Sequence, residues 1–242
     1  MTDVLWTAAR MLASQDDLRA LVIKARGRYF TAGIDLAARP VRNKAEGQVL
    51  RRQYRQHHLL YDEFESIEKP IVLAAQGPCL GAGLDMACSC DIRLASAGAR
   101  FQLPELSLGV IAGSGGTSRL TRLVGPHWAK WLAMASRSVD AQQALMMGLV
   151  HEVLPQDGFE AAVDKIVSEI VMLPREALGV AKLTVDMCAD SDRTTGRNIE
   201  RLANTHLLMS GEYRDRVGAF LRAKDPGTRE GTGPLQAGPV TP

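Results

Sequence analysis

The stretch CLGAGLDMACSCD, residues 79–91, places two glycines and an aspartate between two apolar runs. The run before it, residues 71–77, and the run after it, residues 91–96, are each predicted to form a buried strand. The stretch itself is predicted to turn at its glycines and then to continue as a helix to about Cys88. A strand, a glycine turn and a helix in this order are typical of an α/β protein.

A glycine turn of this kind exposes backbone N–H groups at the start of the helix. With the helix dipole behind them, these donors can hold a phosphate or a developing oxyanion. The sequence disfavours a phosphate. A dinucleotide fingerprint needs a third glycine where Met86 stands, and a Walker loop needs a lysine followed by serine or threonine. The later run GSGG, residues 113–116, lacks that lysine as well, so the residues disfavour a phosphate and leave an oxyanion open for the turn at residues 81–83.

A pocket for an enolate oxygen needs a second donor and a nearby acid or base. The stretch RYFTAGIDL, residues 28–36, offers a second tight turn after a strand predicted at residues 20–25. Asp85 lies one turn inside the predicted helix, and Glu105 follows Pro104 at the end of a short extended piece. These two carboxyl groups are the candidates for acid and base chemistry.

Four stretches in this order resemble successive signatures of the crotonase superfamily, the enoyl-CoA hydratase/isomerase family: residues 28–36, 69–96, 99–125 and 138–155. The resemblance covers residues 3–224 and implies an α/β fold, a crotonase-like ββα spiral core with a C-terminal helical region. The core is expected over residues 1–155, with the oxyanion turns and the acid pair, and a helical trimerisation region over residues 156–224. Residues 225–242 are rich in proline and glycine, which predicts a disordered tail.

The resemblance also assigns roles to individual residues. It implies that the backbone N–H groups of Ala32 and Ala82 form the oxyanion hole for the thioester carbonyl of an acyl-CoA. It implies that Asp85 and Glu105 catalyse the hydration of a trans-2-enoyl-CoA to a 3-hydroxyacyl-CoA, with Asp85 activating the water and Glu105 exchanging the proton at Cα. The substrate-binding positions that it implies lie in the same turns: Phe30, Gly33, Asp35, Leu36, Gly81 and Gly113.

Two departures from the family pattern leave alternatives open. Most hydratases of the family carry glutamate at the position of Asp85, whereas dienoyl-CoA isomerases carry aspartate there and a further aspartate at the position of Gly113. An enoyl-CoA or dienoyl-CoA double-bond isomerase is therefore the alternative, with Glu105 as its acid and base. Family members also begin with a strand pair before the helix that starts near Asp3, so the amino terminus looks shortened: either the true start lies upstream, or coenzyme A binding is weakened or rebuilt. A non-catalytic acyl-CoA-binding protein is the alternative of another class.

Composition and length limit the partners. The formal net charge of +2 over 242 residues predicts no basic face for nucleic acid, and no apolar stretch reaches the length of a membrane span. No secretory signal is expected from the amino-terminal residues, and the four cysteines form no C-x-x-C pair. We therefore expect a cytoplasmic protein of fatty acid metabolism with reduced thiols, no metal, and no cofactor beyond the coenzyme A of its substrate. The resemblance implies a homotrimer or a dimer of trimers.

The remaining segments are predicted to be largely helical. Apolar spacing predicts a helix over residues 3–14, and a polar helix is predicted over residues 44–67, where His57 and His58 are expected to be solvated. After Val150 the chain is predicted to be mostly helical to Ala223 with a break at Pro174.

Overall fold

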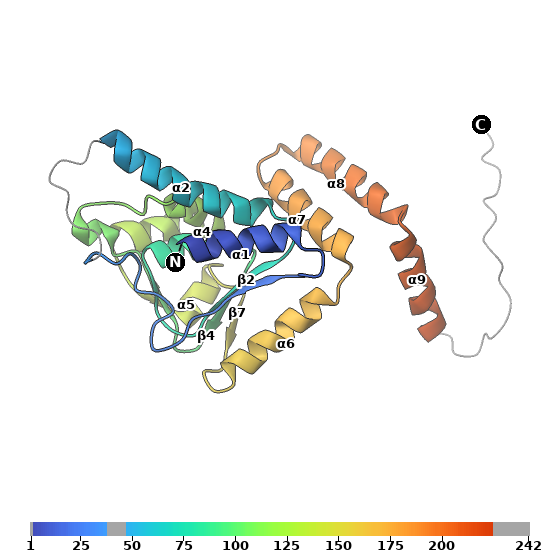
Figure 1. The fold of residues 1–242 in the computed structure, drawn as a ribbon, viewed down its shortest axis with the longest axis horizontal. Coiled ribbons are helices and arrows are strands. Elements are labelled where there is room, and N and C mark those ends of the chain that lie inside the picture. The colour runs from blue at the N-terminus through green and yellow to red at the C-terminus, as the bar shows by residue number, and fades with distance from the viewer. Residues whose placement is uncertain (1, 38–46, 225–242) are drawn as a thin grey trace. The chain divides into compact units, whose positions relative to one another are not determined.

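The computed structural model describes residues 2–37 and 47–224 (Figure 1). The chain divides into two compact units, of which the first ends at Asp186 and the second begins at Met187. The division predicted at residue 155 stays a prediction, and the predicted tail, residues 225–242, lies outside the described residues. In the part of the chain that the structure describes, no helix has the length and apolar character needed to cross a bilayer.

A parallel sheet of four strands forms the centre of the first unit. Its strands are β1 (Leu21–Ile23), β2 (Ile71–Ala75), β4 (Ile92–Ser96) and β7 (Glu152–Leu154), in the spatial order β1-β2-β4-β7. Val72 of β2 pairs with Val22 on one side and Ile92 on the other. All five residues of β2 are buried because both faces of the sheet are covered, as parallel sheets require.

Alternate residues of β2 enter two different clusters, as the two-residue period of a strand dictates. Ile71, Leu73 and Ala75 pack into the larger cluster, which takes in buried residues of α1 (Thr2–Ser14) and α2 (Gly47–Ser66). Val72 and Ala74 face the other way, into a smaller cluster with residues of α6 (Phe159–Val171). Figure 1 shows α1 and α2 on one face of the sheet and α6 on the other.

A second sheet carries the start of the glycine turn. It joins β3 (Cys79–Leu80), β5 (Arg100–Gln102) and β6 (Val139–Asp140), with β3 parallel and β6 antiparallel to β5. The sequence did not predict β3, β6 or β7 as strands, and β7 interrupts a stretch after Val150 that is otherwise mostly helical, as predicted. Strands of two or three residues are too short to show a period, so only their pairing with distant strands defines them.

The predicted helices near residues 3–14 and 82–88 and the break at Pro174 are confirmed, and Pro174 lies between α6 and α7. The predicted helix over residues 44–67 corresponds to α2, and its first three positions lie outside the described residues. The other helical elements are a 3₁₀ helix η1 (Glu105–Leu108), α3 (Ala82–Ala87), α4 (Gly116–Met134), α5 (Ala141–Met146), α7 (Arg175–Ala189), α8 (Arg193–Leu208) and α9 (Gly211–Lys224).

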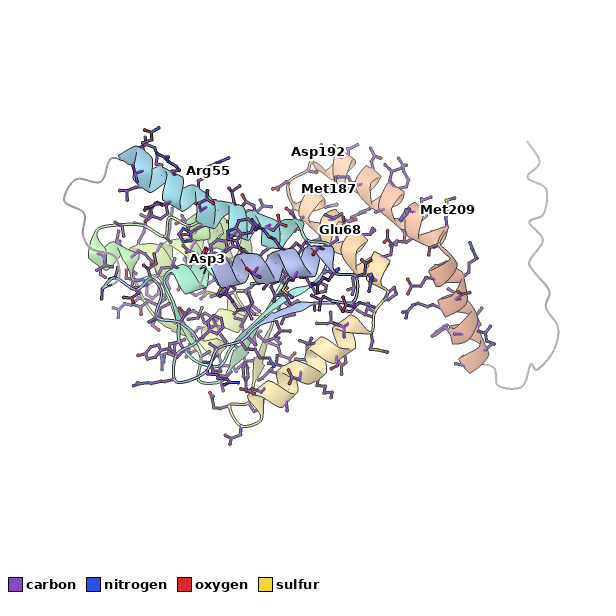
Figure 2. All side chains as sticks on the ribbon, in the orientation of Figure 1. Asp3, Arg55, Glu68, Met187, Asp192 and Met209 are labelled. Carbon is purple, nitrogen blue, oxygen red and sulfur yellow. The ribbon has the colours of Figure 1, made fainter. Side chains whose placement is uncertain are left out.

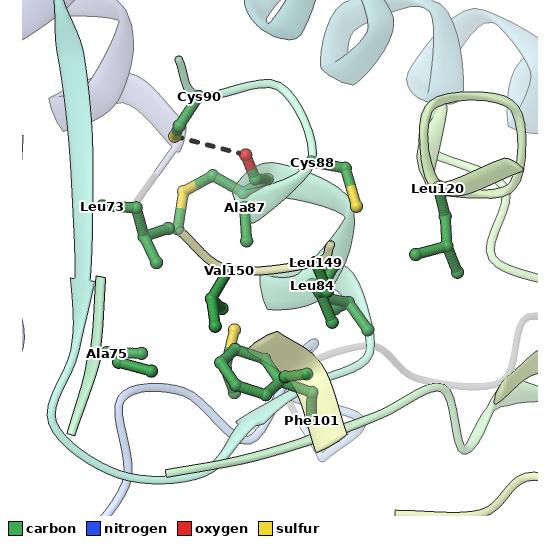
Figure 3. Packing of buried hydrophobic residues seen from close by; sticks show 14 of the residues in the cluster. Leu73, Ala75, Leu84, Ala87, Cys88, Cys90, Phe101, Leu120, Leu149 and Val150 are labelled. Atoms are coloured by element: carbon green, nitrogen blue, oxygen red, sulfur yellow. Dashed lines mark hydrogen bonds between the residues drawn. The ribbon is translucent and has the colours of Figure 1, made fainter. Parts of the chain in front are cut away.

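The helix α3 lies in the middle of the larger cluster (Figure 3). Leu84 and Ala87 of α3 are each 1% exposed, and Phe101 of β5 and Leu149 pack near them. The thiol of Cys90 donates to the Met86 carbonyl at 3.4 Å. Burial raises the pKa of the Cys88 thiol to about 12, so this thiol stays protonated at neutral pH.

Arg93 of β4 holds the carboxyl end of α3. Its side chain is buried, with the whole residue 4% exposed, and its guanidinium donates to the carbonyls of Ala87 and Cys90. The Nε atom donates to the Leu149 carbonyl at 2.8 Å. The guanidinium therefore joins the residues at and after the carboxyl end of α3 to the segment around Leu149.

The second unit contains α8 and α9. Asp192 caps α8 by accepting hydrogen bonds from the backbone N–H groups of Thr194 and Thr195. Met209, between the two helices, is 73% exposed (Figure 2). Further large apolar side chains of this unit are also exposed: Leu202, Leu208, Tyr213, Phe220 and Leu221.

A buried ion pair fastens α7 to the sheet within the first unit. Lys182 Nζ lies 2.9 Å from Asp91 Oδ2 and donates to the Phe64 carbonyl at 2.6 Å. The same Asp91 oxygen accepts from the Ile71 N–H at 2.7 Å. The side chains of Lys182 and Asp91 are only 9% and 24% exposed, so neither charge can be freely solvated.

We expect Lys182→Met to lower the free energy of unfolding by about 3 kcal/mol, because it leaves the Asp91 carboxylate half-buried without its cation. Urea unfolding of the purified variant measures this loss. Lys24→Met is the matched control, since Lys24 pairs with Asp164 at the surface and should cost less than about 1 kcal/mol. Equal losses in the two variants would contradict this account of the buried pair.

Candidate active site

The two predicted turns lie side by side because Thr31 joins the strand β3. Thr31 forms a parallel bridge with Cys79, in which its N–H donates to the Pro78 carbonyl at 3.1 Å. The Leu80 N–H in turn donates to the Thr31 carbonyl at 3.0 Å. The turn that follows β1 is thereby held against the turn that opens α3.

Gly33 shows how close this contact is. A Cβ atom added to Gly33 would lie 3.1 Å from the Leu80 carbonyl oxygen and 3.6 Å from the Ala82 nitrogen. Ala32 and Ala82 thus come from two turns in direct contact. Among the described residues, neither Ala32 nor Ala82 donates its N–H to a backbone carbonyl, and Ala82 is the first residue of its helix.

Glu105 lies over the turn that opens α3. A Cβ atom at Gly81 would fall 2.7 Å from Glu105 Oε1, so a side chain at position 81 would displace this carboxyl group. Gly81 also has a φ of 57°, in the left-handed region that favours glycine. Glu105 begins η1, and its Oε2 atom is buried with no hydrogen-bond partner among the described residues.

Asp85 lies one turn into α3 and is 2% exposed. Its Oδ2 atom accepts a hydrogen bond from the Ser114 N–H at 3.3 Å, whereas Oδ1 is buried without a partner among the described residues. A Cβ atom at Gly116 would lie 1.7 Å from Oδ1. The carboxyl group therefore packs against the glycine turn that opens α4, where only glycine leaves it room.

Burial is the main influence on the protonation of both acids. It raises the pKa of Asp85 to about 7, and the negative charge of Glu105 adds to that rise. The Ser114 N–H and the charge of Arg119 oppose it. Burial also raises the pKa of Glu105 above its ordinary value. Burial together with the charge of Glu105 therefore makes the Asp85 carboxyl group harder to ionise than a free aspartate.

The remaining predicted positions differ in their surroundings. Phe30 is 8% exposed and belongs to the hydrophobic core, whereas Leu36 is 60% exposed. Asp35 accepts a hydrogen bond from the Ala37 N–H at 3.0 Å. The structure brings Gly33 and Gly81 together with the two acids, and it leaves Leu36 at the surface.

Gly113 is covered by α2, which sequence analysis did not connect with the site. A Cβ atom at Gly113 would lie 3.3 Å from Tyr54 Cε1. His58 Nε2 lies 2.7 Å from the Gly113 carbonyl oxygen, so the expectation that His58 is solvated is wrong. Sequence analysis missed Ser114, and the close packing expected of the glycines near the start of α4 is confirmed at Gly116, where the partner is Asp85.

The described residues offer no metal centre at the acid pair. Among residues 2–37 and 47–224, no cluster of three or more His, Cys, Asp or Glu side chains is placed to hold a metal ion. A surface pocket of about 940 Å³ lies along α4, and none of its lining residues belongs to the two turns: Pro126, His127, Trp128, Lys130, Trp131, Met134 and Ala135. The chemistry that the site itself offers is acid and base catalysis beside two backbone N–H donors.

Comparisons with known proteins identify the family of the chain. A family model described as enoyl-CoA hydratase/isomerase matches residues 1–228. The chain is 31% identical over 214 residues to a short-chain-enoyl-CoA hydratase of Clostridium acetobutylicum, which covers 88% of this chain and 81% of that protein. It is 32% identical over 209 residues to the enoyl-CoA isomerase/hydratase fer4 of Mycosarcoma maydis, covering 86% and 75% of the two chains.

A solved structure gives the same result for the fold. The crystal structure of an enoyl-CoA hydratase from Bacillus anthracis matches with a TM-score of 0.83 at 27% identity, covering 93% of this chain and 85% of that chain. The expected crotonase-like α/β fold is thereby confirmed. With a family model that matches nearly its whole length, the chain belongs to the enoyl-CoA hydratase/isomerase family of the crotonase superfamily.

Proposed function

We propose that the protein hydrates a trans-2-enoyl-CoA to a 3-hydroxyacyl-CoA. One observation carries the proposal: two carboxyl groups, Asp85 and Glu105, each keep a buried oxygen without a partner beside the helix start at Ala82. Unpartnered buried polar atoms are rare in proteins and indicate a site that a substrate or water completes. Membership of the family supports an acyl-CoA substrate.

The backbone N–H groups of Ala32 and Ala82 bind the thioester carbonyl in this proposal. Addition at Cβ of a conjugated thioester moves negative charge onto that carbonyl oxygen, which becomes the oxyanion of an enolate. Donors that are already in place stabilise this charge without reorganising, and each is typically worth about 3–4 kcal/mol. The contact between Gly33 and the Ala82 nitrogen supports two donors converging on one oxygen.

The two carboxyl groups divide the proton transfers. Asp85 holds the water and accepts a proton from it as its oxygen adds to Cβ, and Glu105 delivers a proton to Cα. One proton therefore enters the pair from water and one leaves it to the substrate, so the pair ends with its starting charge. Because the pKa of Asp85 is raised to about 7, the carboxylate that accepts this proton is the main form only above neutral pH.

Double-bond isomerisation is the second candidate. It requires a single acid and base, and Glu105 beside Gly81 would serve; the relative fer4 is named an isomerase/hydratase. The dienoyl-CoA form of this reaction is disfavoured at Gly113. Tyr54 Cε1 lies 3.3 Å from where a Cβ atom would stand, so an aspartate there would require the tyrosine ring to move.

The proposed reaction also implies a cofactor requirement, an assembly and a location. Catalysis uses no metal and no redox cofactor, and coenzyme A takes part only as the carrier of the acyl group. The exposed apolar side chains of the second unit support assembly as a homotrimer or a dimer of trimers. We propose a cytoplasmic location, since the three cysteines of the first unit are buried free thiols.

Glu105→Gln should lower turnover of crotonyl-CoA by about 10²–10⁴-fold with the fold intact, because the amide cannot deliver the proton to Cα. Loss of the absorbance of the conjugated thioester measures turnover, and circular dichroism checks the fold. Glu152→Gln, an exposed change on β7, is the control and should keep wild-type turnover. Near-normal turnover by Glu105→Gln would overturn the proposal. Binding of acyl-CoA by the wild type without turnover of 2-enoyl or 3-enoyl substrates would favour the non-catalytic alternative.

The stability of Asp85→Asn should depend on pH in a defined direction. The folded pKa of Asp85, about 7, is above the unfolded value, so its stabilising contribution is present at low pH and is lost as pH rises through 7. Relative to wild type, Asp85→Asn should gain stability between about pH 4 and 7, by up to about 4 kcal/mol. Urea unfolding at each pH measures the difference. The exposed variant Asp157→Asn should follow the wild type at every pH, and a flat difference for Asp85→Asn would contradict the raised pKa.

A further inference from the structure

An arginine of α4 joins α2 to the glycine turn that holds Asp85. The Arg119 side chain is 12% exposed, and its Nη2 atom lies 2.6 Å from Asp62 Oδ1. It also forms a two-point contact with Glu65, with Nε 2.7 Å from Oε1 and Nη2 2.6 Å from Oε2. A bidentate contact of this kind fixes the plane of the guanidinium as well as its position.

The fixed guanidinium packs against the turn itself. A Cβ atom at Gly115 would lie 2.2 Å from Arg119 Nη1, so the guanidinium occupies the space that a side chain would take. The backbone N–H of Arg119 also donates to the Gly115 carbonyl at 3.2 Å, an ordinary helical hydrogen bond that does not depend on the side chain. Gly115 lies between Ser114, whose N–H binds Asp85 Oδ2, and Gly116, which packs against Oδ1. The Arg119 guanidinium therefore packs against Gly115, the middle residue of the segment that contacts both oxygens of Asp85.

The same guanidinium has a second link to the site through Tyr61 of α2. Its Cζ atom lies 6.0 Å from the centroid of the Tyr61 ring, which is a cation–π distance. Tyr61 is 5% exposed, and its hydroxyl donates a long hydrogen bond of 3.5 Å to the Ala82 carbonyl. The Arg119 side chain thus contacts the turn that holds Asp85, and it also contacts Tyr61, which binds the carbonyl of the first residue of α3.

We propose that Arg119 is a positioning residue for Asp85: it clamps the turn Ser114–Gly116 to α2, so that the Ser114 N–H holds Oδ2 and Oδ1 is left for the water. This inference rests on the proposed hydration at the same site. Arg119 touches neither the acyl group nor the water in this account, and it acts only through the turn and through its charge.

The positive charge of Arg119 should have an effect on the pKa of Asp85 that its packing alone would not produce. The titratable and charged groups that act on Asp85 or respond to it come from several elements: Glu105 of η1, Arg119 of α4, Tyr61 of α2, Cys79 of β3, and Cys88 at the end of α3. Arg119 is the one cation in this described set. Because the charge of Arg119 lowers the pKa of Asp85, removal of Arg119 should raise that pKa further.

The experiment compares Arg119→Met, Arg119→Lys and Arg55→Met with wild type. Arg55 is exposed on α2 and serves as the control (Figure 2). For hydration of crotonyl-CoA, Arg119→Met should lower kcat by about 10–100-fold, as misplacement of a catalytic group does, with KM changed less than about threefold. In this variant the acidic limb of the pH profile, where kcat falls at low pH, should move to higher pH. Arg119→Lys should restore the position of this limb but not the full kcat, because lysine keeps the charge without the two-point contact.

A second measurement does not depend on activity. The stability difference between each Arg119 form and its Asp85→Asn double variant, followed against pH, reports the protonation of Asp85 directly. Its midpoint should rise in Arg119→Met and stay near wild type in Arg119→Lys. If wild type shows no hydration while this midpoint still moves, the proposed function fails and the electrostatic link to Asp85 stands.

Two results would overturn the inference. The first is an unchanged kcat and acidic limb in folded Arg119→Met. The second is a loss of thermal stability with neither the limb nor the Asp85 midpoint moved, which would make Arg119 structural only. All measurements are made on protein that is folded at the assay temperature. If Arg119→Met does not fold, Arg119→Lys alone distinguishes a positioning role from a purely structural role.

Discussion

The close approach of Glu105 to the α-carbon of Gly81 is the constraint on which the site depends. With Glu105 Oε1 2.7 Å from the place of a Cβ atom, no side chain fits at position 81 while this carboxyl group stays in place. The backbone at Gly81 also has a positive φ, so the same residue that admits the acid starts the helix α3. One missing side chain thereby sets the helix start at Ala82 and the position of Glu105 together.

The helix that begins there is too short to hold itself in place. Six residues, Ala82–Ala87, form fewer than two turns, and an isolated helix of this length is unstable in water. Its position comes instead from the apolar side chains around Leu84 and from Arg93, whose guanidinium binds carbonyls at its carboxyl end. The donors at its amino end and Asp85 one turn later are therefore as rigid as the core around them.

The two acids are costly to bury. Desolvation disfavours their ionised forms, and each keeps one oxygen without a partner among the described residues. The stability of the surrounding fold offsets this unfavourable free energy. Such an arrangement is typical of sites whose chemistry needs carboxyl groups of raised pKa. The shorter side chain of aspartate at position 85 suits this environment, because its carboxyl group fills the space left at Gly116 and meets the Ser114 N–H.

The sequence by itself determined the local pieces: a strand, the glycine turn and α3 with Asp85, a second turn at residues 28–36, and Glu105 after Pro104. Apolar runs, glycines and the order of the motifs carry that information within short windows, and the family and its fold follow from it. Only the tertiary structure decided which distant segments meet. The bridge of Thr31 to Cys79, the Ser114 N–H on Asp85, and the contact of Arg119 with Asp62 and Glu65 leave no local signal, because each depends on a partner far along the chain. The three-residue strand β7 was missed for the same physical reason: it is a strand because β4 supplies its hydrogen bonds, not because of its own residues.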